Sequence, residues 1–457
     1  MVTLHRFSVH TPQVRPQTAR KSVLQLYAME TAELYNIFTQ HPTITTDSRD
    51  CQPGSIFFAL KGASFDGNRF AAAALEKGCA YAVVDDPQCA TDSRFLLVDD
   101  CLRALQQLAN FHRRALGTRI IGITGTNGKT TTKELTAAVL GEKYNVLYTQ
   151  GNFNNDIGVP KTLLRLRPEH DVAVVEMGAS HPGDIKTLVD IVEPDCGLIT
   201  NVGRAHLQGF GSLEGVVRTK GEFYDYLRSR PGTTVFLHHE DERLQAIAEG
   251  LPTVEYGTAE GLFVSGKVES CSPLLTFSWK QRAGNWHRVE SHLIGSYNLD
   301  NMLAAATVGL WFGVSAEQVD HALTAYTPSN NRSQLEQTAS NCLIVDAYNA
   351  NPTSMAAALR NFSGLEAGKK MAILGDMREL GEASHEEHQK AVDLMQQLGL
   401  EDIWLVGEEF GKTQCPYRKF SDVEAVKAAI ADQQPQGYCI LIKGSNGTRL
   451  FQLPGLL

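Results

Sequence analysis

An apolar run, a glycine turn and the start of a helix follow one another without a gap at residues 119–140, and this order constrains the fold more than any other feature. Glycines at the turn let the backbone point its N–H groups inward around phosphate oxygens, the lysine adds positive charge, and the hydroxyl after it can bind Mg²⁺. The stretch therefore predicts a strand, a phosphate-binding loop and a helix. The loop residues are Gly125, Thr126, Asn127, Gly128, Lys129, Thr130 and Thr131.

The strict phosphate-loop pattern G-x-x-x-x-G-K-[ST] requires glycine at position 123, where this chain has Ile123. The shorter run G-T-N-G-K-T is intact. A glycine turn before a helix needs no ligand by itself, but that simpler interpretation explains neither the Lys129–Thr130 pair nor the preceding strand. We therefore expect a nucleoside triphosphate at this loop.

Composition limits the other possibilities. With 457 residues and 43% apolar content, the chain has material for three domains of roughly 100 to 200 residues each. A net charge of −9 without a long basic block argues against nucleic acid as the main partner. Nine cysteines without C-x-x-C spacing indicate reduced thiols and a cytoplasmic location, and no apolar run is long enough to span a membrane.

Alternating strand and helix patterns predict an α/β protein of three domains. Residues 1–28 contain no Asp or Glu and form either a loose extension before Met29 or a targeting segment. We expect a small α/β domain at 29–116, a central domain at 117–326 with a mostly parallel sheet and a short antiparallel insertion near 261–290, and a doubly wound domain at 327–457. In the last domain we expect strands at 341–346, 370–375, 402–406 and 438–443, with helices at 352–362, 384–398 and 422–432.

Two polar side chains follow apolar strands of the central domain. Glu176 ends the run D-V-A-V-V-E, and His206 lies in the loop after C-G-L-I-T-N. Ligands of parallel sheets bind beyond the carboxyl ends of the strands, so both side chains are expected near Lys129. A carboxylate and an imidazole there could bind a divalent metal, although either alone would more often be an ordinary turn residue.

Three amide-rich stretches could contact ligands. Asn152, Asn154 and Asn155 precede a helix that begins near Val159, but such turns also cap helices without a ligand. Asn298 and Asn301 are one helical turn apart and can face one ligand. In the last domain, Tyr348, Asn349 and Asn351 follow a strand in D-A-Y-N-A-N-P.

Two further positions are ambiguous on their residues alone. Ser48 and Arg49, in the island T-D-S-R, could hold a phosphate or a nucleotide base, but ordinary Asx and Ser turns explain the island without a ligand. Lys220 lies in a helical pattern at 212–227, whose periodicity places it on a solvated face.

Four motifs occur in one order over the three domains: G-N-F-N-N-D-I-G-V-P, V-E-M-G-A, D-A-Y-N-A-N-P-x-S-M and L-G-D-M-x-E-L-G-x-x-S-x-x-x-H. Together with the phosphate loop they resemble the Mur ligases, the ATP-dependent amide-forming enzymes of bacterial cell-wall precursor synthesis. They look most like the family members that add D-alanyl-D-alanine to UDP-N-acetylmuramoyl-tripeptide. The resemblance runs from about Glu33 to the last strand.

The resemblance implies ATP and Mg²⁺ as cofactors. It also implies D-alanyl-D-alanine and UDP-N-acetylmuramoyl-tripeptide as substrates, and a monomeric enzyme. The first domain would hold the UDP-sugar through Ser48 and Arg49, and the last domain would present the dipeptide. Asn298 or Asn301 would lie near the adenine, while Arg332 and Asp346 would reach the nucleotide. The substrate carboxylate would attack the γ-phosphorus of ATP, and the dipeptide amine would attack the resulting acyl phosphate.

The resemblance also assigns the catalytic and metal roles. Lys129, Lys220, His206 and Glu176 would be catalytic, and Thr130, Glu176, His206 and Lys220 would hold metal, with Lys220 carbamylated by CO₂. Another Mur-type ligase or a folate-polyglutamate-type ligase is the alternative enzyme. A nucleotide switch without ligase activity is the alternative of another class, and it should show a Walker B strand ending in Asp.

Overall fold

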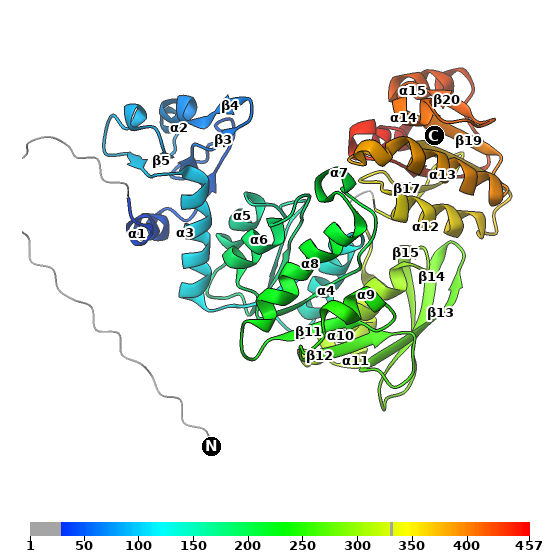
Figure 1. The fold of residues 1–457 in the computed structure, drawn as a ribbon, viewed down its shortest axis with the longest axis horizontal. Helices are drawn as coiled ribbons and strands as arrows, with labels where there is room; N and C mark the ends of the chain where they lie inside the picture. The colour runs from blue at the N-terminus through cyan, green and yellow to red at the C-terminus, as the bar shows by residue number, and fades with distance from the viewer. Residues whose placement is uncertain (1–28, 330–331) are drawn as a thin grey trace, which may run out of the picture. The chain divides into compact units, whose positions relative to one another are not determined.

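The computed structural model describes residues 29–329 and 332–457, so the extension expected at 1–28 lies outside the described residues (Figure 1). Residues 29–34 and 43–101 form one compact unit, and residues 35–42 and 102–457 form a second. The first unit contains a parallel sheet with a separate two-stranded hairpin, and the second contains two larger sheets. The α/β class is confirmed, while the boundaries of the three domains stay a prediction.

The sheet of the first unit has the order β1-β2-β5-β6. Helix α2 ends just before Gly78, whose φ of +114° suits a glycine that stops a helix. The elements of this part of the chain are α1 (Thr31–Gln40), β1 (Ile44–Thr45), β2 (Ile56–Phe58), β3 (Lys61–Gly62), β4 (Phe65–Asp66), η1 (Gly67–Phe70), α2 (Ala71–Glu76), β5 (Tyr81–Val84), η2 (Pro87–Cys89) and β6 (Phe95–Leu97).

The central sheet has the order β15-β14-β13-β12-β11-β10-β7-β9-β8. Its strands are β7 (Arg119–Thr124), β8 (Val146–Tyr148), β9 (Val172–Glu176), β10 (Cys196–Ile199), β11 (Thr234–His238), β12 (Thr253–Gly257), β13 (Val264–Cys271), β14 (Leu274–Gln281) and β15 (His287–Ile294). Its helices are α3 (Cys101–Leu116), α4 (Lys129–Gly141), α5 (Gly158–Leu163), α6 (Asp184–Val192), α7 (Leu207–Phe210), α8 (Leu213–Arg228), α9 (Glu242–Ile247), α10 (Asn298–Trp311) and α11 (Ala316–Ala325). Strands β13–β15 pair antiparallel, so the expected antiparallel insertion is confirmed.

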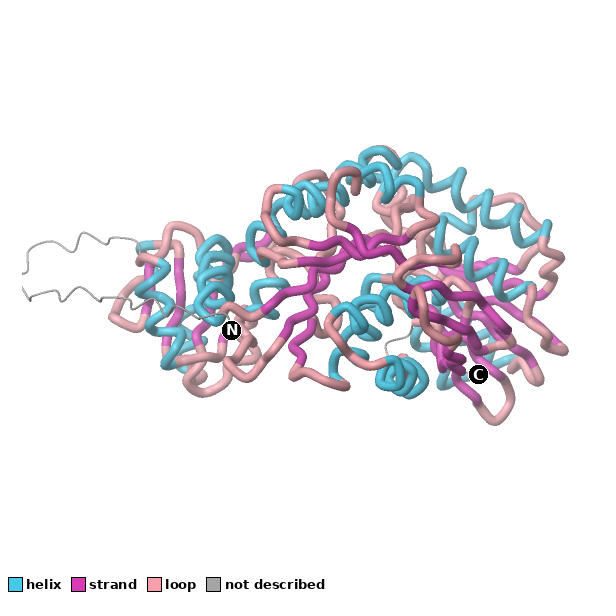
Figure 2. The backbone as a smooth tube through the Cα atoms, turned by 90° about the horizontal axis from the view of Figure 1, so that it is seen from below, coloured by secondary structure: helices cyan, strands magenta, loops and turns pink. Residues whose placement is uncertain are grey.

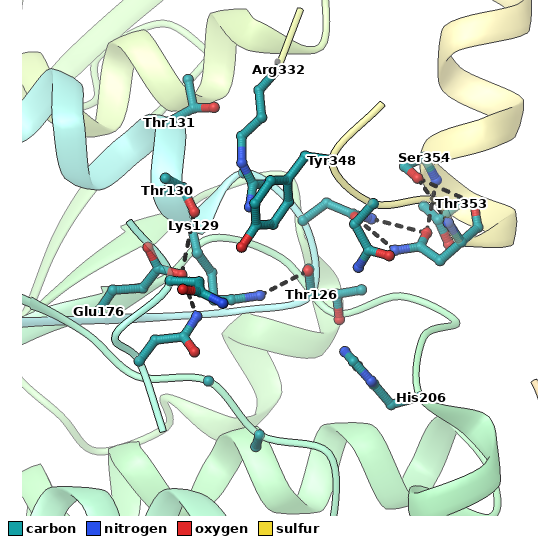
Figure 3. A pocket seen from close by; sticks show the side chains of 18 of the residues that line it. Thr126, Lys129, Thr130, Thr131, Glu176, His206, Arg332, Tyr348, Thr353 and Ser354 are labelled. Carbon is teal, nitrogen blue, oxygen red and sulfur yellow. Dashed lines mark hydrogen bonds between the residues drawn. The ribbon is translucent and has the colours of Figure 1, made fainter. Parts of the chain in front are cut away.

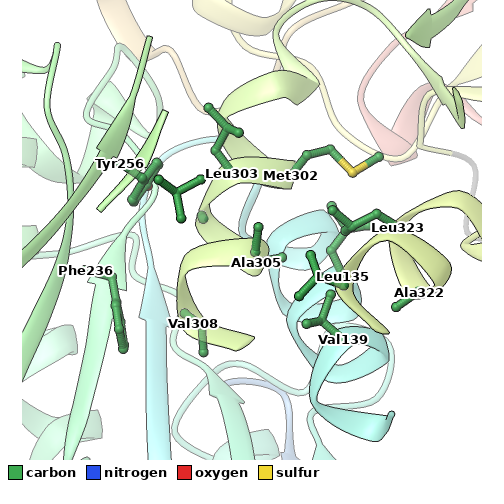
Figure 4. Close-up of a cluster of buried hydrophobic side chains, with 14 of the residues drawn as sticks. Leu135, Val139, Phe236, Tyr256, Met302, Leu303, Ala305, Val308, Ala322 and Leu323 are labelled. Atoms are coloured by element: carbon green, nitrogen blue, oxygen red, sulfur yellow. The ribbon is translucent and has the colours of Figure 1, made fainter. Parts of the chain in front are cut away.

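Apolar side chains of α4, α10 and α11 pack on one face of this sheet (Figure 4). Helix α10 lies at the centre of the cluster, and its Leu303 is fully buried. Both faces of β7 are covered, because Ile120 through Thr124 are all buried. Burial on two faces explains why β7 is a continuous apolar run instead of an alternating one.

The third sheet has the order β16-β17-β21-β18-β19-β20 and is parallel apart from β16. Its strands are β16 (Gln334–Gln337), β17 (Cys342–Asp346), β18 (Lys369–Gly375), β19 (Asp402–Val406), β20 (Arg418–Phe420) and β21 (Tyr438–Lys443). Its helices are α12 (Pro352–Ser363), η3 (Gly381–Ala383), α13 (Ser384–Gln397), α14 (Glu408–Gly411), α15 (Val423–Asp432), η4 (Asn446–Thr448), η5 (Leu450–Gln452) and η6 (Pro454–Leu456). The sequence interpretation missed the short elements β16, α14 and β20.

Successive residues of β17 belong to different cores. Ile344 packs with α12 and α13, whereas Leu343 and Val345 pack with α15. Side chains alternate across a strand, so this division means that helices cover both faces of the sheet. Figure 2 distinguishes the helices of the chain, in cyan, from its strands, in magenta. The doubly wound arrangement expected here is confirmed.

Strand order in the central sheet determines where the functional loops meet. Strand β7 lies between β9 and β10 and is parallel to both, with Ile123 beside Glu176 and Thr124 beside Ile199. The carboxyl ends of parallel neighbours reach the same edge of a sheet. The loops after β7, β9 and β10 therefore converge at this edge.

We predict that Leu303→Ala destabilises the second unit by about 2 to 5 kcal/mol, because it removes buried methyl groups and leaves a cavity. The measurement is the midpoint of urea unfolding followed by circular dichroism. Leu456→Ala makes the same chemical change where the side chain is 42% exposed and should leave the midpoint nearly unchanged. Equal midpoints for the two variants would contradict the central position of α10 in the core.

Candidate active site

A pocket of about 910 Å³ opens at the convergent loops of the second unit. Residues 126–131 form one wall, and side chains from the third sheet, including Asp346 and Tyr348, form another (Figure 3). The pocket therefore combines the carboxyl edges of two parallel sheets.

The turn between β7 and α4 has the geometry of a phosphate-binding loop. The φ angles of Gly125 and Gly128 are +143° and +78°. A Cβ on Gly125 would lie 2.0 Å from Thr200 Oγ1, and one on Gly128 would lie 2.4 Å from Asn301 Oδ1. The first N–H groups of a helix have no acceptor within the helix, and residues 128–131 line the pocket, so this helix start suits an anion.

Ile123 explains the failed match to the strict pattern. Its side chain is fully buried within β7, two residues before the turn begins at Gly125. No special backbone geometry is needed inside the strand, so glycine is not required there.

Two residues after β10 support the loop from behind. Asn127 N donates to Asn201 Oδ1 at 3.0 Å, and Thr126 N donates to Asn201 O at 2.9 Å. The hydroxyl of Thr200 donates to Asn127 O at 2.6 Å. The sequence interpretation missed Asn201, although its place directly after a strand adjacent to β7 was the available signal.

Lys129 folds back over the loop. Its Nζ donates to Gly125 O at 2.9 Å and to Thr126 O at 3.0 Å. Burial lowers the pKa of Lys129 and nearby Arg332 lowers it further, while Glu176 acts in the opposite direction. The ammonium lies in the pocket with acceptors that phosphate oxygens could replace.

Glu176 lies beside the loop and has a free acceptor. Its Oε1 accepts from Asn154 Nδ2 at 2.8 Å and from Thr130 Oγ1 at 3.3 Å (Figure 3). Its Oε2 is buried without a hydrogen-bond partner. An unsatisfied buried carboxylate oxygen is unfavourable, and a hard cation would satisfy it. The oxygen donors of Thr130 and Glu176 therefore fit Mg²⁺.

His206 lines the same pocket but has a different partner. Its Nδ1 lies 2.5 Å from Oε2 of Glu379 in the C-terminal part of the second unit. No three His, Cys, Asp or Glu side chains gather as a metal cluster within residues 29–329 and 332–457. A shared metal for Glu176 and His206 thus stays a prediction.

The observed burial of Lys220 differs from the exposure that the helical periodicity predicted. The expectation of a solvated lysine is wrong, because the residue is 2% exposed inside α8. Its Nζ lies 3.5 Å from Thr124 Oγ1 and 5.9 Å from the centre of the Phe210 ring. Burial, and then the charge of Lys129, lower the pKa of Lys220 well below its ordinary value. The helix is packed against the sheet over more of its surface than the apolar residues alone indicated.

Asn298 and Asn301 connect α10 to the phosphate-loop helix. Asn301 Oδ1 accepts from Thr132 Oγ1 at 3.0 Å, and its Nδ2 donates to Asn298 Oδ1 at 2.8 Å. Both asparagines line the pocket. A supporting role for Asn301 follows from these bonds, while adenine contact by either residue stays a prediction.

The third sheet contributes a charge pair at adjacent strand ends. Asp346 at the end of β17 and Lys443 at the end of β21 are neighbours in register, and their Oδ2 and Nζ atoms lie 2.5 Å apart. Near them, the guanidinium of Arg332 lies 3.8 Å from the centre of the Tyr348 ring, and its Nε is buried without a partner. Lys443 was not assigned a role from the sequence, although its place at the end of an apolar strand was a usable signal.

The remaining asparagines divide between structural contacts and pocket lining. Asn155 Oδ1 accepts from the N–H of Gly158, the first residue of α5, at 2.8 Å. Asn351 caps α12, and its Nδ2 donates to Asn127 Oδ1 of the phosphate loop at 2.7 Å. Asn349 accepts from Ala350 N. All three line the pocket with Asn152, so their expected contacts with substrate stay predictions.

Ser48 and Arg49 belong to the first unit. Asp47 Oδ1 accepts from Arg49 N at 2.9 Å, and the Arg49 guanidinium lies 2.7 Å from Asp47 Oδ2. Ser48 O accepts from Lys77 Nζ at 2.7 Å. These contacts form an Asx turn that needs no ligand, and contact with a UDP group stays a prediction.

The two expected absences concern cysteine pairing and membrane spans. All nine cysteines of the chain are described and are free thiols. No helix in the described part of the chain is long and apolar enough to cross a membrane.

The fold and the pocket define a class: a P-loop enzyme whose nucleotide-type site is completed by a second, doubly wound sheet. Comparison with known families then identifies the group. Residues 42–113 match the Mur ligase family catalytic domain, residues 123–309 match the Mur ligase middle domain, and residues 331–446 match the Mur ligase glutamate ligase domain. The chain belongs to the Mur ligase family.

Individual relatives cover most of the chain. The UDP-N-acetylmuramoyl-tripeptide--D-alanyl-D-alanine ligase of Bacillus subtilis is 35% identical over 425 residues, which are 90% of this chain and 92% of that protein. A crystal structure of MurF from Acinetobacter baumannii has a TM-score of 0.81 at 34% identity, covering 90% of this chain and 92% of that chain. MurF ligase from Thermotoga maritima in complex with ADP also has a TM-score of 0.81, at 26% identity, covering 91% and 96%.

We predict that Gly128→Ala weakens ATP binding at least tenfold. A side chain there is strained at a φ of +78° and collides with Asn301 Oδ1 2.4 Å away, so the loop must move. The measurement is calorimetric titration with ATP. Gly141→Ala is the matched control, because it lies in the same helix with no atom within 4 Å of the added Cβ. Equal affinity in both variants would show that the loop is not the nucleotide site.

Proposed function

We propose that the chain is an ATP-dependent amide ligase of the cytoplasm that joins D-alanyl-D-alanine to UDP-N-acetylmuramoyl-tripeptide in peptidoglycan precursor synthesis. The observation on which this proposal depends is that one pocket combines a phosphate loop with Asp346, Arg332 and Tyr348 from the C-terminal part of the chain. The relatives that share this chain over nine-tenths of its length bear that activity in their names, which supports the choice of substrates.

ATP phosphates would occupy the mouth of the loop. Lys129 would exchange the carbonyls of Gly125 and Thr126 for phosphate oxygens, and Arg332 would approach the nucleotide from the other side. Asn298 or Asn301 would lie near the adenine. Mg²⁺, held by Thr130 and Glu176, would supply charge neutralisation at the phosphates.

The reaction requires positioning and charge balance more than a protein nucleophile. The terminal carboxylate of the tripeptide would attack the γ-phosphorus, giving an acyl phosphate and ADP. The amine of the dipeptide would then attack the acyl carbon, forming the amide as phosphate leaves and a proton is lost. Lys129 faces the transferring phosphoryl group and balances its charge without reorganising solvent.

Substrate contacts are assigned by domain. Ser48 and Arg49 would hold the uridine diphosphate end, and Asn152, Asn154 and Asn155 would contact the growing peptide. Tyr348, Asn349 and Asn351 would contact the incoming dipeptide. We propose that the enzyme acts as a monomer on these two small-molecule substrates.

A folate-polyglutamate-type ligase is the alternative with similar central chemistry. Two features favour the cell-wall reaction over it: the parallel sheet of the first unit, and the D-A-Y-N-A-N-P loop that places Asp346 and Tyr348 in the pocket. A simple nucleotide switch does not account for the convergence of the two sheets.

We predict that the purified protein joins D-alanyl-D-alanine to UDP-N-acetylmuramoyl-tripeptide, releasing one phosphate for each amide. Mass spectrometry of the product and a phosphate assay check this. Phosphate release should require the carboxylate and amine substrates together. Addition of a free diamino acid to the UDP-dipeptide, or of glutamate to a folate, would contradict the assignment.

Lys220 is the proposed site of a covalent modification. A buried ammonium with its closest hydroxyl 3.5 Å away is poorly solvated, and its lowered pKa favours the neutral amine. The neutral nitrogen would attack CO₂, forming an N–C bond and losing a proton, which leaves a carbamate. An anionic carbamate would attract a cation that the ammonium repels. With Glu176 and His206 it would hold a second metal.

We predict that Lys220→Ala loses most activity and is partly rescued by a short carboxylate. Carbamylation needs the neutral amine, so its extent should rise as pH increases through the lowered pKa of Lys220 and fall below it. Wild-type enzyme stripped of CO₂ at mildly acidic pH should be inactive and recover with bicarbonate. ¹³C NMR with labelled bicarbonate detects the carbamate directly. Lys186→Ala, at an exposed lysine of the neighbouring helix α6, is the control and should remain active. Near-normal turnover of Lys220→Ala would contradict the proposal.

A further inference from the structure

His206 and Glu379 share an unusual backbone geometry. Their φ angles are +50° and +66°, two of the five positive values at non-glycine residues in the described chain. Such conformations are unfavourable for residues with a side chain and persist where the surroundings impose them. These two strained residues face each other, with His206 Nδ1 2.5 Å from Glu379 Oε2.

The segment 203–210, which contains His206, is held by the C-terminal part of the second unit. Arg204 Nη1 lies 2.9 Å from Glu387 Oε1, and Gln208 N donates to Glu379 O at 3.2 Å. Leu207 packs against the core between the third sheet and α12 and α13. The pair is thus one of several contacts that fix this segment on the other sheet.

The beginning of the same segment is bonded to the phosphate loop. Gly203 N donates to Thr126 Oγ1 at 3.0 Å, and Thr126 Oγ1 lies 3.4 Å from Gly203 O. Segment 203–210 therefore connects the nucleotide loop directly with the docked third sheet. His206 lies between these two attachments.

Glu379 is presented by a loop that is fixed before it. Asp376 accepts from the N–H groups of Glu409 and Phe410 at 3.0 and 2.9 Å. Met377 N donates to the buried His388 Nε2 at 3.0 Å, and Arg378 N donates to Ser445 Oγ at 3.0 Å. The proposed chemistry gives no role to the motif G-D-M-x-E or to His388 after it. The bonds above show that these residues fix the loop that carries Glu379.

We propose that Glu379 is a positioning residue that orients the imidazole of His206 from the C-terminal part of the chain. A carboxylate at Nδ1 keeps the proton on that nitrogen, so Nε2 presents its lone pair. The ring is directed into the pocket towards Thr126 (Figure 3). In the structure Nδ1 of His206 has no aligned hydrogen-bond partner, and Oε2 of Glu379, whose side chain is 55% exposed, is the carboxylate oxygen beside it, 2.5 Å away. This role rests on the proposed function.

Docking of the third sheet against the central sheet would then determine how the His206 imidazole is oriented. The phosphate loop and Glu176 come from the central sheet alone, whereas the orientation of His206 needs Glu379. The site is then complete only while the two sheets are docked. A ligand that bridges them would both require and stabilise this arrangement.

Glu379→Gln tests the role, because it removes the negative charge and keeps the shape and backbone strain. We expect kcat to fall about 10- to 100-fold, with the KM for ATP changed less than about threefold. Glu382→Gln is the matched control, since Glu382 is an exposed carboxylate three residues further along. It should retain wild-type kcat. Unchanged kcat in Glu379→Gln, or an equal loss in Glu382→Gln, would overturn the proposal.

A second measurement needs no catalysis. In protein labelled with ¹⁵N-histidine, imidazole nitrogen shifts at an alkaline pH report which nitrogen carries the proton, and His206→Asn assigns the signal. We expect the Nδ1–H form in the wild type and a mixture in Glu379→Gln. An unchanged tautomer in the variant would overturn the proposal even if kcat fell. If wild-type enzyme made no amide, the proposed function would fail, while this measurement would still decide the role of Glu379.

Discussion

The phosphate loop has no space for side chains behind it, and the rest of the site depends on that constraint. Thr200 and Asn301 lie where Cβ atoms on Gly125 and Gly128 would be. These polar side chains hold the back of the loop, so the front N–H groups remain available to a ligand. Thr200 follows β10 and Asn301 lies on α10, so the packing of one strand and one helix sets the geometry of the anion site.

Three charged side chains near the loop share one poorly solvated region, and their interactions explain why none is an ordinary surface group. Burial lowers the pKa values of Lys129 and Lys220; the charge of Arg332 lowers that of Lys129 further, and the charge of Lys129 lowers that of Lys220 further. Glu176 offsets part of this, but one of its oxygens has no partner. Phosphate at Lys129 and cation at Glu176 would each satisfy a group that the protein leaves incompletely paired.

The sequence predicted the site residues whose position follows from local sequence order. It did not predict contacts that depend on how helices and sheets pack against one another. Strand, turn and helix at 119–140 predicted the loop, and strand ends predicted Glu176 and Asp346. Burial of Lys220 could not be predicted, because helical spacing does not reveal how much of a helix a neighbouring sheet covers. The His206–Glu379 pair was equally hidden, since its partners are 173 positions apart and meet through tertiary packing. Asp346 and Lys443 are an intermediate case: both end apolar strands, but only strand order makes them neighbours.

Several polar contacts join the central and third sheets at the pocket. Asn127 bonds to Asn351, Arg204 to Glu387, and His206 contacts Glu379. Individual hydrogen bonds and partly exposed ion pairs contribute little net free energy, because water competes for the same groups. Such contacts fix orientation without making the arrangement permanent. A nucleotide that touches Lys129 on one side and Arg332 on the other adds favourable contacts only when both sides are present. The binding energy of the nucleotide thereby helps to hold the two sheets together around the site. The reaction then depends on substrates that contact both sheets.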